Sequence, residues 1–259
     1  MVPIWLPKNI DTINSIDFLM KRRLSSGRKG GTFLMTDIAK AKAHIAKIGQ
    51  MLFQRRLTDA AGGNVSVRVD DVMCMSPSYS GSKRQWELEP DQVLVVGMDG
   101  KILEGDGEVS RETNVHVTLN AEFSDYGNAV IHAHPRNLLV FAALEESMPP
   151  VLEANLKFGE IPCVPYAPAH SPDLARHVAN GIRGHEERIR KHAFGVIAPW
   201  HGLFLMGKDL DAAFDAVERF DTNARAILMA RMTGRSDKIE EKREALQQIV
   251  KVHEQEHKV

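Results

Sequence analysis

Hydrophobic residues follow a helical spacing early in the chain and strand-like spacings further along. Between about residues 37 and 57, apolar side chains recur mostly three or four positions apart. Thr36 and Asp37, which precede them, are residue types that favour helix N-caps. The glycine-rich stretch 60–64 follows, and residues 65–69 then alternate between apolar and polar side chains. This pattern predicts an amphipathic helix, a turn and a half-buried strand.

Later apolar runs are short and separated by turn residues, which is typical of a sheet. Asp99-Gly100 between two such runs predicts a β-hairpin. Helices are expected between these strands. Residues 112–122 show helical spacing, Pro135 suits the first position of a helix, and Ser-Pro-Asp at Ser171 starts a predicted helix of about 20 residues. Further strands are expected at residues 72–75, 93–97, 102–103, 129–134, 194–198 and 203–206, and a long helix over 210–232. The order of elements predicts an α/β layered domain, with helices covering a mixed sheet.

Composition divides the chain into three regions. Residues 1–35 are rich in proline, glycine and basic residues and are expected to form an N-terminal arm. Residues 36–235 carry the alternating strands and helices of a single domain, within which 151–170 is punctuated by prolines and predicted to be extended. Residues 236–259 are highly charged and are predicted to form a helical tail.

Charge and cysteine content narrow the class of protein. The 259-residue chain has 33 Lys plus Arg against 34 Asp plus Glu, and a net charge of -1 argues against a nucleic-acid surface or a polybasic membrane anchor. Its two cysteines, Cys74 and Cys163, lack CxxC spacing and favour a reducing, cytoplasmic setting over a disulfide framework. No apolar run approaches the roughly 20 residues of a membrane span. The start of the chain also lacks the pattern of a signal peptide.

Two histidines two residues apart form the clearest chemical signal. His132 and His134 follow an apolar run, and on an extended strand both imidazoles would point to the same side. His201 lies between two predicted strands and is a candidate third ligand. Three imidazoles with an open fourth position are typical of catalytic zinc. Taken alone, however, the same alternation also places unrelated histidines on one face of a strand.

Other motifs suggest groups that could serve such a metal. Glu112 could fill or vacate the fourth position, and His116, one helical turn later, could be a site residue or an orienting partner. Gly62-Gly63-Asn64 fits either a helix C-cap or an anion cradle of backbone N–H groups. The hydroxyl-rich stretch 76–82 fits either a solvated turn or part of a binding loop.

Taken in order, these motifs resemble the class II aldolase/adducin family over about residues 37 to 232. The resemblance implies a three-layer α/β/α domain with a central mixed, largely antiparallel sheet, and it implies a homotetramer. The motifs that carry it are GGNVS at 62–66, the serine loop at 76–81, Ser110-x-Glu112-x-x-x-His116, His132-Ala133-His134-Pro135, Cys163-Val164-Pro165-Tyr166 and His201-Gly202-Leu203.

The family pattern assigns a role to each matching residue. His132, His134 and His201 match its zinc ligands, and Glu112 matches an acidic residue that ligates the metal at rest and then moves a proton. The positions that match the phosphate site are Gly63, Asn64, Ser80, Gly81 and Ser110. The metal, expected to be Zn²⁺ with Mn²⁺ or Co²⁺ as alternatives, would stabilise an enediolate next to the bond that breaks.

Three departures from the family pattern bear on the substrate. Ala61-Gly62 stand where the family often has a threonine before Gly-Asn, which removes a hydroxyl donor. Arg111 replaces a phosphate-binding serine, and it could grip a phosphate or a carboxylate, or point to solvent. Glu153 stands near the position of a catalytic tyrosine supplied by a neighbouring subunit, so it is a candidate acid or a sign of a different reaction. We therefore predict a metal-dependent lyase of the aldolase type acting on a small polyhydroxylated keto substrate such as a sugar phosphate. A sugar-phosphate or sugar-acid epimerase, dehydratase or decarboxylase, and a non-catalytic adducin-like interaction module, are the alternatives.

Overall fold

The computed structural model describes residues 31–256 and is built on a seven-stranded sheet of order β4-β3-β2-β1-β5-β7-β6. Each neighbouring pair in this sheet is antiparallel, and an isolated bridge from Cys163 to Ile197 is parallel. The strands are β1 (Asn64–Val69), β2 (Val72–Met75), β3 (Leu94–Gly97), β4 (Ile102–Glu104), β5 (Ala129–Ala133), β6 (Ala193–Ala198) and β7 (Gly202–Gly207). The predicted hairpin is confirmed, because β3 and β4 pair across the turn at Asp99-Gly100.

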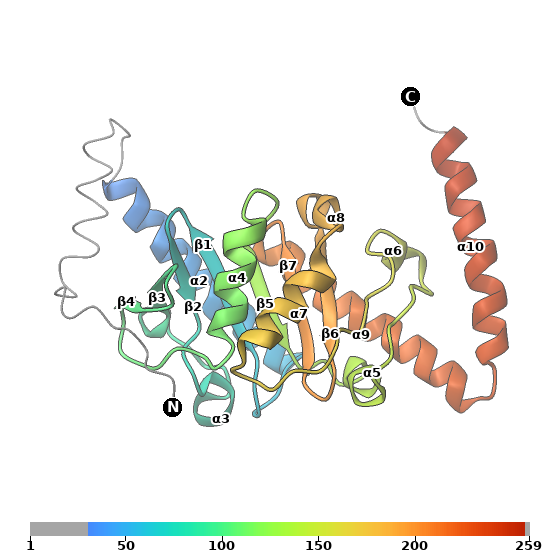
Figure 1. Ribbon diagram of the computed structural model, residues 1–259, viewed down its shortest axis with the longest axis horizontal. Coiled ribbons are helices and arrows are strands. Elements are labelled where there is room, and N and C mark those ends of the chain that lie inside the picture. Colours follow the sequence, from blue (N-terminus) through green and yellow to red (C-terminus); the bar gives the residue numbers. More distant parts are fainter. Residues whose placement is uncertain (1–30, 257–259) are drawn as a thin grey trace.

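Helices cover both faces of the sheet, so the three-layer α/β/α prediction is confirmed (Figure 1). On one face lie α2 (Gly31–Gln54), α5 (Leu138–Leu144) and α9 (Leu210–Met232), and on the other lie α4 (Thr113–Phe123), α7 (Pro172–Ile182) and α8 (Glu186–Lys191). Shorter helical segments are α3 (Ser80–Arg84), η1 (Pro90–Gln92) and α6 (Glu153–Leu156).

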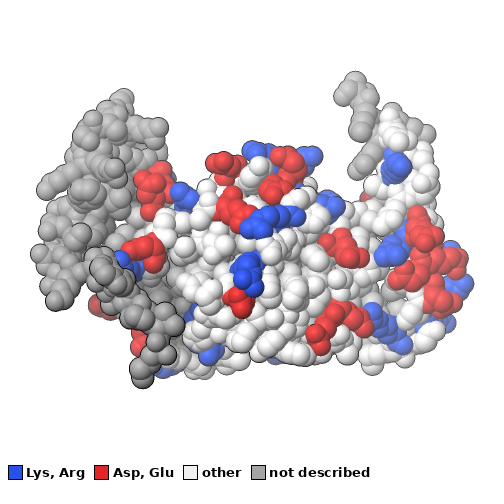
Figure 2. Space-filling model, in the orientation of Figure 1, with Lys and Arg blue, Asp and Glu red and all other residues white. Residues whose placement is uncertain are grey.

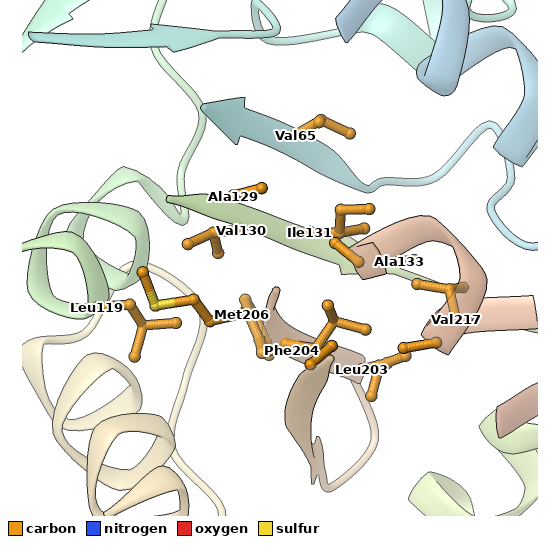
Figure 3. Packing of buried hydrophobic residues seen from close by; sticks show 14 of the residues in the cluster. Val65, Leu119, Ala129, Val130, Ile131, Ala133, Leu203, Phe204, Met206 and Val217 are labelled. Carbon is orange, nitrogen blue, oxygen red and sulfur yellow. The ribbon is translucent and has the colours of Figure 1, made fainter. Parts of the chain in front are cut away.

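The pleat of the central strands sorts side chains between the two helical layers. In Figure 3, Val130 and Met206 lie beside Leu119 of α4, whereas Ile131 and Leu203 lie toward Val217 of α9. Successive residues of a strand point to opposite faces, so the side chain after Ile131 returns to the face covered by α4. That side chain is His132, and the strand therefore delivers an imidazole beneath the start of α4.

Several helix boundaries differ from the sequence prediction. The first helix starts at Gly31, five residues before the predicted cap at Thr36, and so includes residues assigned to the arm. The rest of that arm, residues 1–30, lies outside the described residues. The helix of about 20 residues predicted from Ser171 is instead two helices, α7 and α8, because Gly184 adopts a positive φ of 84° between them.

Two segments predicted to be extended or loop-like contain short helices. Glu153 begins α6, and Ser80 and Gly81 begin α3. The charged tail is helical from Ser236 to Glu256 as α10, and its charged side chains crowd one end of the surface in Figure 2. Within residues 31–256, no helix has the length and apolar content needed to cross a membrane.

Candidate active site

Three histidines meet at one end of the central strands. His132 and His134 lie at the carboxyl end of β5, and His201 directly precedes β7, the neighbouring strand. Their candidate ligand nitrogens all lie within 4.8 Å of one another. The His132 side chain is buried and stacks on Phe204, with ring centroids 4.1 Å apart. The structure therefore brings together the three histidines that the sequence singled out.

Hydrogen bonds to the far side of two rings fix which nitrogen faces the centre of the cluster. His132 Nδ1–H donates to the Leu203 carbonyl at 2.9 Å, and His134 Nδ1–H donates to the Asp59 carboxylate at 3.1 Å. These partners assign the tautomer and leave both Nε2 lone pairs, 3.2 Å apart, facing inward. Two unprotonated nitrogens at this separation repel unless something binds them, so the donor set fits a divalent metal ion such as zinc.

Burial favours the neutral imidazoles that metal binding requires. It lowers the pKa of His132 well below its ordinary value, and the neighbouring His134 and His201 lower it further. Burial also lowers the pKa of His201, although the nearby Glu112 carboxylate acts in the opposite direction. Both shifts favour the uncharged ring, which is the form that coordinates metal ions.

Glycines let the backbone approach the cluster closely. A Cβ at Gly62 would lie 2.6 Å from His134 Cε1, and a Cβ at Gly202 would lie 2.8 Å from His134 Cδ2. Gly63 has a φ of 95°, a conformation that other residues rarely adopt. The Gly62-Gly63 pair is thus required by the space beside His134 as well as by the turn.

Glu112 faces the histidines from the start of α4. It is buried, and its Oε1 lies 3.8 Å from His201 Nε2. Its other oxygen, Oε2, accepts hydrogen bonds from Ser110 Oγ at 2.8 Å and Asn64 Nδ2 at 3.1 Å. One carboxylate oxygen is therefore held by neutral donors while the other points toward the cluster.

His116 orients Asn64 from behind. Ser66 Oγ–H donates to His116 Nδ1 at 2.6 Å, and His116 Nε2–H donates to Asn64 Oδ1. Asn64 then presents its NH₂ group to Glu112, so a buried chain of hydrogen bonds runs from β1 to the carboxylate. Complete burial lowers the pKa of His116 to about 3, which keeps the ring neutral and in this tautomer. Of the two roles left open for His116, the geometry matches the orienting partner.

Two adjoining hollows share Ala61, Gly62, Arg111 and Glu112 in their walls. The narrower hollow, about 390 Å³, holds the three histidines together with Tyr166 and Trp200. The wider hollow, about 780 Å³, is lined by the residues predicted to hold phosphate, which are Gly63, Asn64, Ser80, Gly81, Ser110 and Arg111. Metal ligands and predicted anion-binding groups thus lie side by side in one groove.

At two residues the structure differs from the sequence prediction. Glu153 is exposed and lines neither of these hollows within a single chain. The sequence prediction overlooked Asp59, whose carboxylate orients His134 and also accepts from the N–H groups of Ala61 and Gly62. An aspartate directly before a glycine-rich turn is a common turn initiator, which was the available signal.

Comparisons with known proteins identify relatives of this chain. The family model for the Class II Aldolase and Adducin N-terminal domain matches residues 43–228. The chain is 25% identical over 200 residues to a 5-deoxy-D-ribulose 1-phosphate aldolase of Bacillus thuringiensis serovar kurstaki, covering 76% of this chain and 88% of that protein. It is 27% identical over 198 residues to a 3-oxo-tetronate 4-phosphate decarboxylase of Haemophilus influenzae, covering 74% and 88%.

A solved structure with the same fold is that of an L-fuculose 1-phosphate aldolase. It superimposes with a TM-score of 0.67 at 24% identity, over 80% of this chain and 96% of that one. The match of the family model spans the whole described sheet and both hollows. The chain belongs to the class II aldolase and adducin family.

Proposed function

We propose that this class II aldolase-like chain is a zinc-dependent lyase that cleaves or forms a carbon–carbon bond in a small polyhydroxylated keto phosphate. The observation that carries the proposal is the three-histidine cluster facing Glu112 in a groove that adjoins a polar hollow. His132, His134 and His201 would hold the metal. When bound, the metal would supply Lewis-acid polarisation of a ketone, which lowers the energy of negative charge developing beside it.

The wider hollow would anchor the phosphate. Asn64 Nδ2 and Ser110 Oγ both donate to one oxygen of Glu112, so they offer an anion site that the carboxylate fills in this structure. A phosphate oxygen could take the place of that carboxylate oxygen when Glu112 turns away. Arg111, which lines both hollows, adds a guanidinium able to bind an anion bidentately.

Glu112 would move the proton. Its Oε1 already lies 3.8 Å from His201 Nε2, so once released from its two donors the carboxyl group would face the reacting carbon of a ketone bound beside the histidines. Removing a proton from that carbon, or returning one to it after the bond breaks, is general acid/base work for a carboxyl group held in a buried site. The His116–Asn64 hydrogen bond would keep the donors aligned while the carboxylate is at rest.

Decarboxylation of a phosphorylated 3-oxo acid is the second candidate, and Arg111 favours it. Loss of CO₂ beside a ketone leaves negative charge on the same type of carbon as aldol cleavage, so the same groups would serve. A guanidinium between the metal hollow and the phosphate hollow could hold the departing carboxylate. A relative that decarboxylates 3-oxo-tetronate 4-phosphate supports this alternative.

A panel of substrates tests both reactions. Purified protein would first be analysed for bound metal, and then offered ketose 1-phosphates and 3-oxo acid phosphates, with coupled detection of the three-carbon keto phosphate and of CO₂. Aldol cleavage without CO₂ release supports the first proposal, and CO₂ release supports the second. If zinc content is unchanged when His132, His134 and His201 are all replaced by alanine, the metal site is wrong.

Other outcomes of the same panel distinguish the remaining alternatives. Inversion of a hydroxyl-bearing carbon without cleavage would indicate an epimerase, and loss of water a dehydratase. Intact metal with no turnover on any substrate would favour an adducin-like interaction module. The homotetramer and the cytoplasmic location stay predictions, and analytical ultracentrifugation of the metal-loaded protein tests the former.

A further inference from the structure

The last two helices of the described chain meet at a tight corner. α9 ends in a Schellman motif, in which the Gly234 N–H donates to the Arg231 carbonyl at 3.1 Å and the Arg235 N–H donates to the Ala230 carbonyl at 2.8 Å. Gly234 takes the positive φ of 67° that this cap requires. The chain therefore turns directly into α10, which packs against α6 and α9 (Figure 1).

A cleft remains between α10 and the body of the protein. This α10 cleft has a volume of about 550 Å³, within the roughly 300–1,000 Å³ that small-molecule sites occupy. On its α9 side, Ala226 and Ala230 stand one helical turn apart, and their small side chains leave the space open. The apolar side chains that line it are Val151, Leu152, Ala226, Ala230, Ile239 and Leu246. Among the described residues, none lines both this cleft and the metal or polar hollow.

The charged residues of the α10 cleft are all basic. Within residues 31–256, those that line it are Arg235, Lys238, Lys242 and Arg243. Carboxylate oxygens of Glu241 lie 2.8 Å from Lys238 Nζ and 3.1 Å from Lys242 Nζ. A carboxylate oxygen of Glu240 lies 2.8 Å from an Nη atom of Arg243. Two carboxylates thus meet three of the four cations, so the cleft keeps an excess of positive charge.

Two of these cations have unused capacity to bind an anion. Arg243 Nε–H is buried and has no hydrogen-bond acceptor in the described part of the chain. Arg235 is exposed, and no ion pair joins it to a carboxylate of the described residues. A buried donor without an acceptor costs free energy, because it has given up its bonds to water. The cleft therefore presents a free donor and a positive charge beside an apolar surface.

We propose that the α10 cleft binds a single-chain amphiphile with an anionic head group, such as a medium-chain fatty acid. The alkyl chain lies on the apolar lining, where its removal from water is favourable. The head group accepts a hydrogen bond from Arg243 Nε–H and lies near Arg235, and such charge-assisted bonds are stronger than those between neutral groups. The site is independent of the proposed function, because its α10 wall lies outside residues 43–228, which the family model matches.

Two amphiphiles of opposite charge test this proposal. Decanoate and decyltrimethylammonium carry alkyl chains of similar length, so they differ mainly in the head group. Isothermal titration of the full-length protein is expected to show binding of decanoate and at least about tenfold weaker binding of decyltrimethylammonium. Arg243→Met keeps the apolar stem of the side chain and is expected to weaken decanoate binding about tenfold. Arg235→Met is expected to weaken it about threefold, because Arg235 is exposed.

Ala230→Leu tests the apolar part of the cleft. The leucine side chain would fill the space beside α10, so decanoate affinity is expected to fall at least about tenfold while the melting temperature stays near the wild-type value. Ala245→Leu is the matched control, at an exposed residue of α10 that does not line the cleft. Arg111→Met is the control for Arg243→Met, because Arg111 lines the two hollows near the histidines, where a carboxylate could also bind. Both controls are expected to bind decanoate as the wild-type protein does.

Several results would overturn the proposal. Absence of decanoate binding would do so, and so would equal binding of the two amphiphiles. An equal loss of affinity in Arg111→Met and Arg243→Met would place the bound decanoate near the histidines instead. If decanoate does not bind and Ala230→Leu changes the sedimentation coefficient, copies of the chain cover the cleft and the proposal is wrong.

Discussion

The two halves of the groove are built in different ways. In the metal hollow the three histidines stand at or next to the ends of β5 and β7, and the imidazoles of His132 and His134 are held by bonds to Leu203 and Asp59. The polar hollow is lined mostly by loop residues, at 60–64, 77–82 and 108–114. Strand ends are rigid and suited to reaction chemistry, whereas loops are the parts of a fold that vary most. We infer that the histidines and Glu112 set the reaction and that the loops around the polar hollow set the substrate.

The largest effect is expected from Glu112→Gln. The amide cannot exchange a proton at the reacting carbon, so turnover should fall on the order of 100-fold or more, while bound metal stays near the wild-type level. Steady-state kinetics and elemental analysis of the same preparation would measure both. Glu153→Gln is the comparison variant. An equal loss of turnover there would show that Glu153 acts in a site, and an unchanged rate in Glu112→Gln would remove Glu112 from the mechanism.

A smaller effect is expected from Asp59→Asn. Asparagine keeps an oxygen that can accept from the turn N–H groups, but it loses the charge that orients His134. Metal affinity should fall roughly 10- to 100-fold, as for other carboxylates behind a histidine ligand. Competition with a fluorescent chelator would measure it. Asp99→Asn, in the polar hollow, should leave metal affinity unchanged, and an equal loss there would contradict the division between the two halves.

A third effect concerns His116, and it acts on the pH dependence of stability rather than on turnover or metal binding. Its pKa is about 3 in the folded chain against an ordinary value of 6.5, so the unfolded chain binds the extra proton first as pH falls. The contribution of the neutral His116 to the free energy of unfolding is fully present above pH 6.5. It is lost progressively as pH falls to about 3, at about 1.4 kcal/mol per pH unit. Urea unfolding of metal-free protein at several pH values would measure this slope.

His116→Gln separates this contribution from those of other groups. Glutamine does not titrate, so the variant should be less stable at pH 7.5 and should lose less stability on acidification than the wild-type protein. Asn120→Ala, at a buried residue of the same helix that does not titrate, is the control; it should lower stability and keep the wild-type slope. A His116→Gln slope equal to that of the wild-type protein would show that other groups dominate.

The sequence by itself determined the parts that depend on local spacing. Alternation in β5 placed His132 and His134 on one face, and the apolar runs predicted the strands that carry them. Local spacing did not predict the conformation of short segments that could be either helical or extended. Examples are the break between α7 and α8 and the short helix that begins at Ser80. Short segments gain little from their own hydrogen bonds, so tertiary contacts decide their conformation.

Only the tertiary structure decided which distant groups meet. Strand register places Asn64 opposite His132 and His132 opposite Phe204, and a shift of one residue would turn each of these side chains to the other face. Asp59 reaches His134 across 75 residues of sequence by the same pairing of elements. The sequence therefore supplied the metal ligands, and the packing of the sheet decided which groups orient these ligands and which residues line the hollow around them.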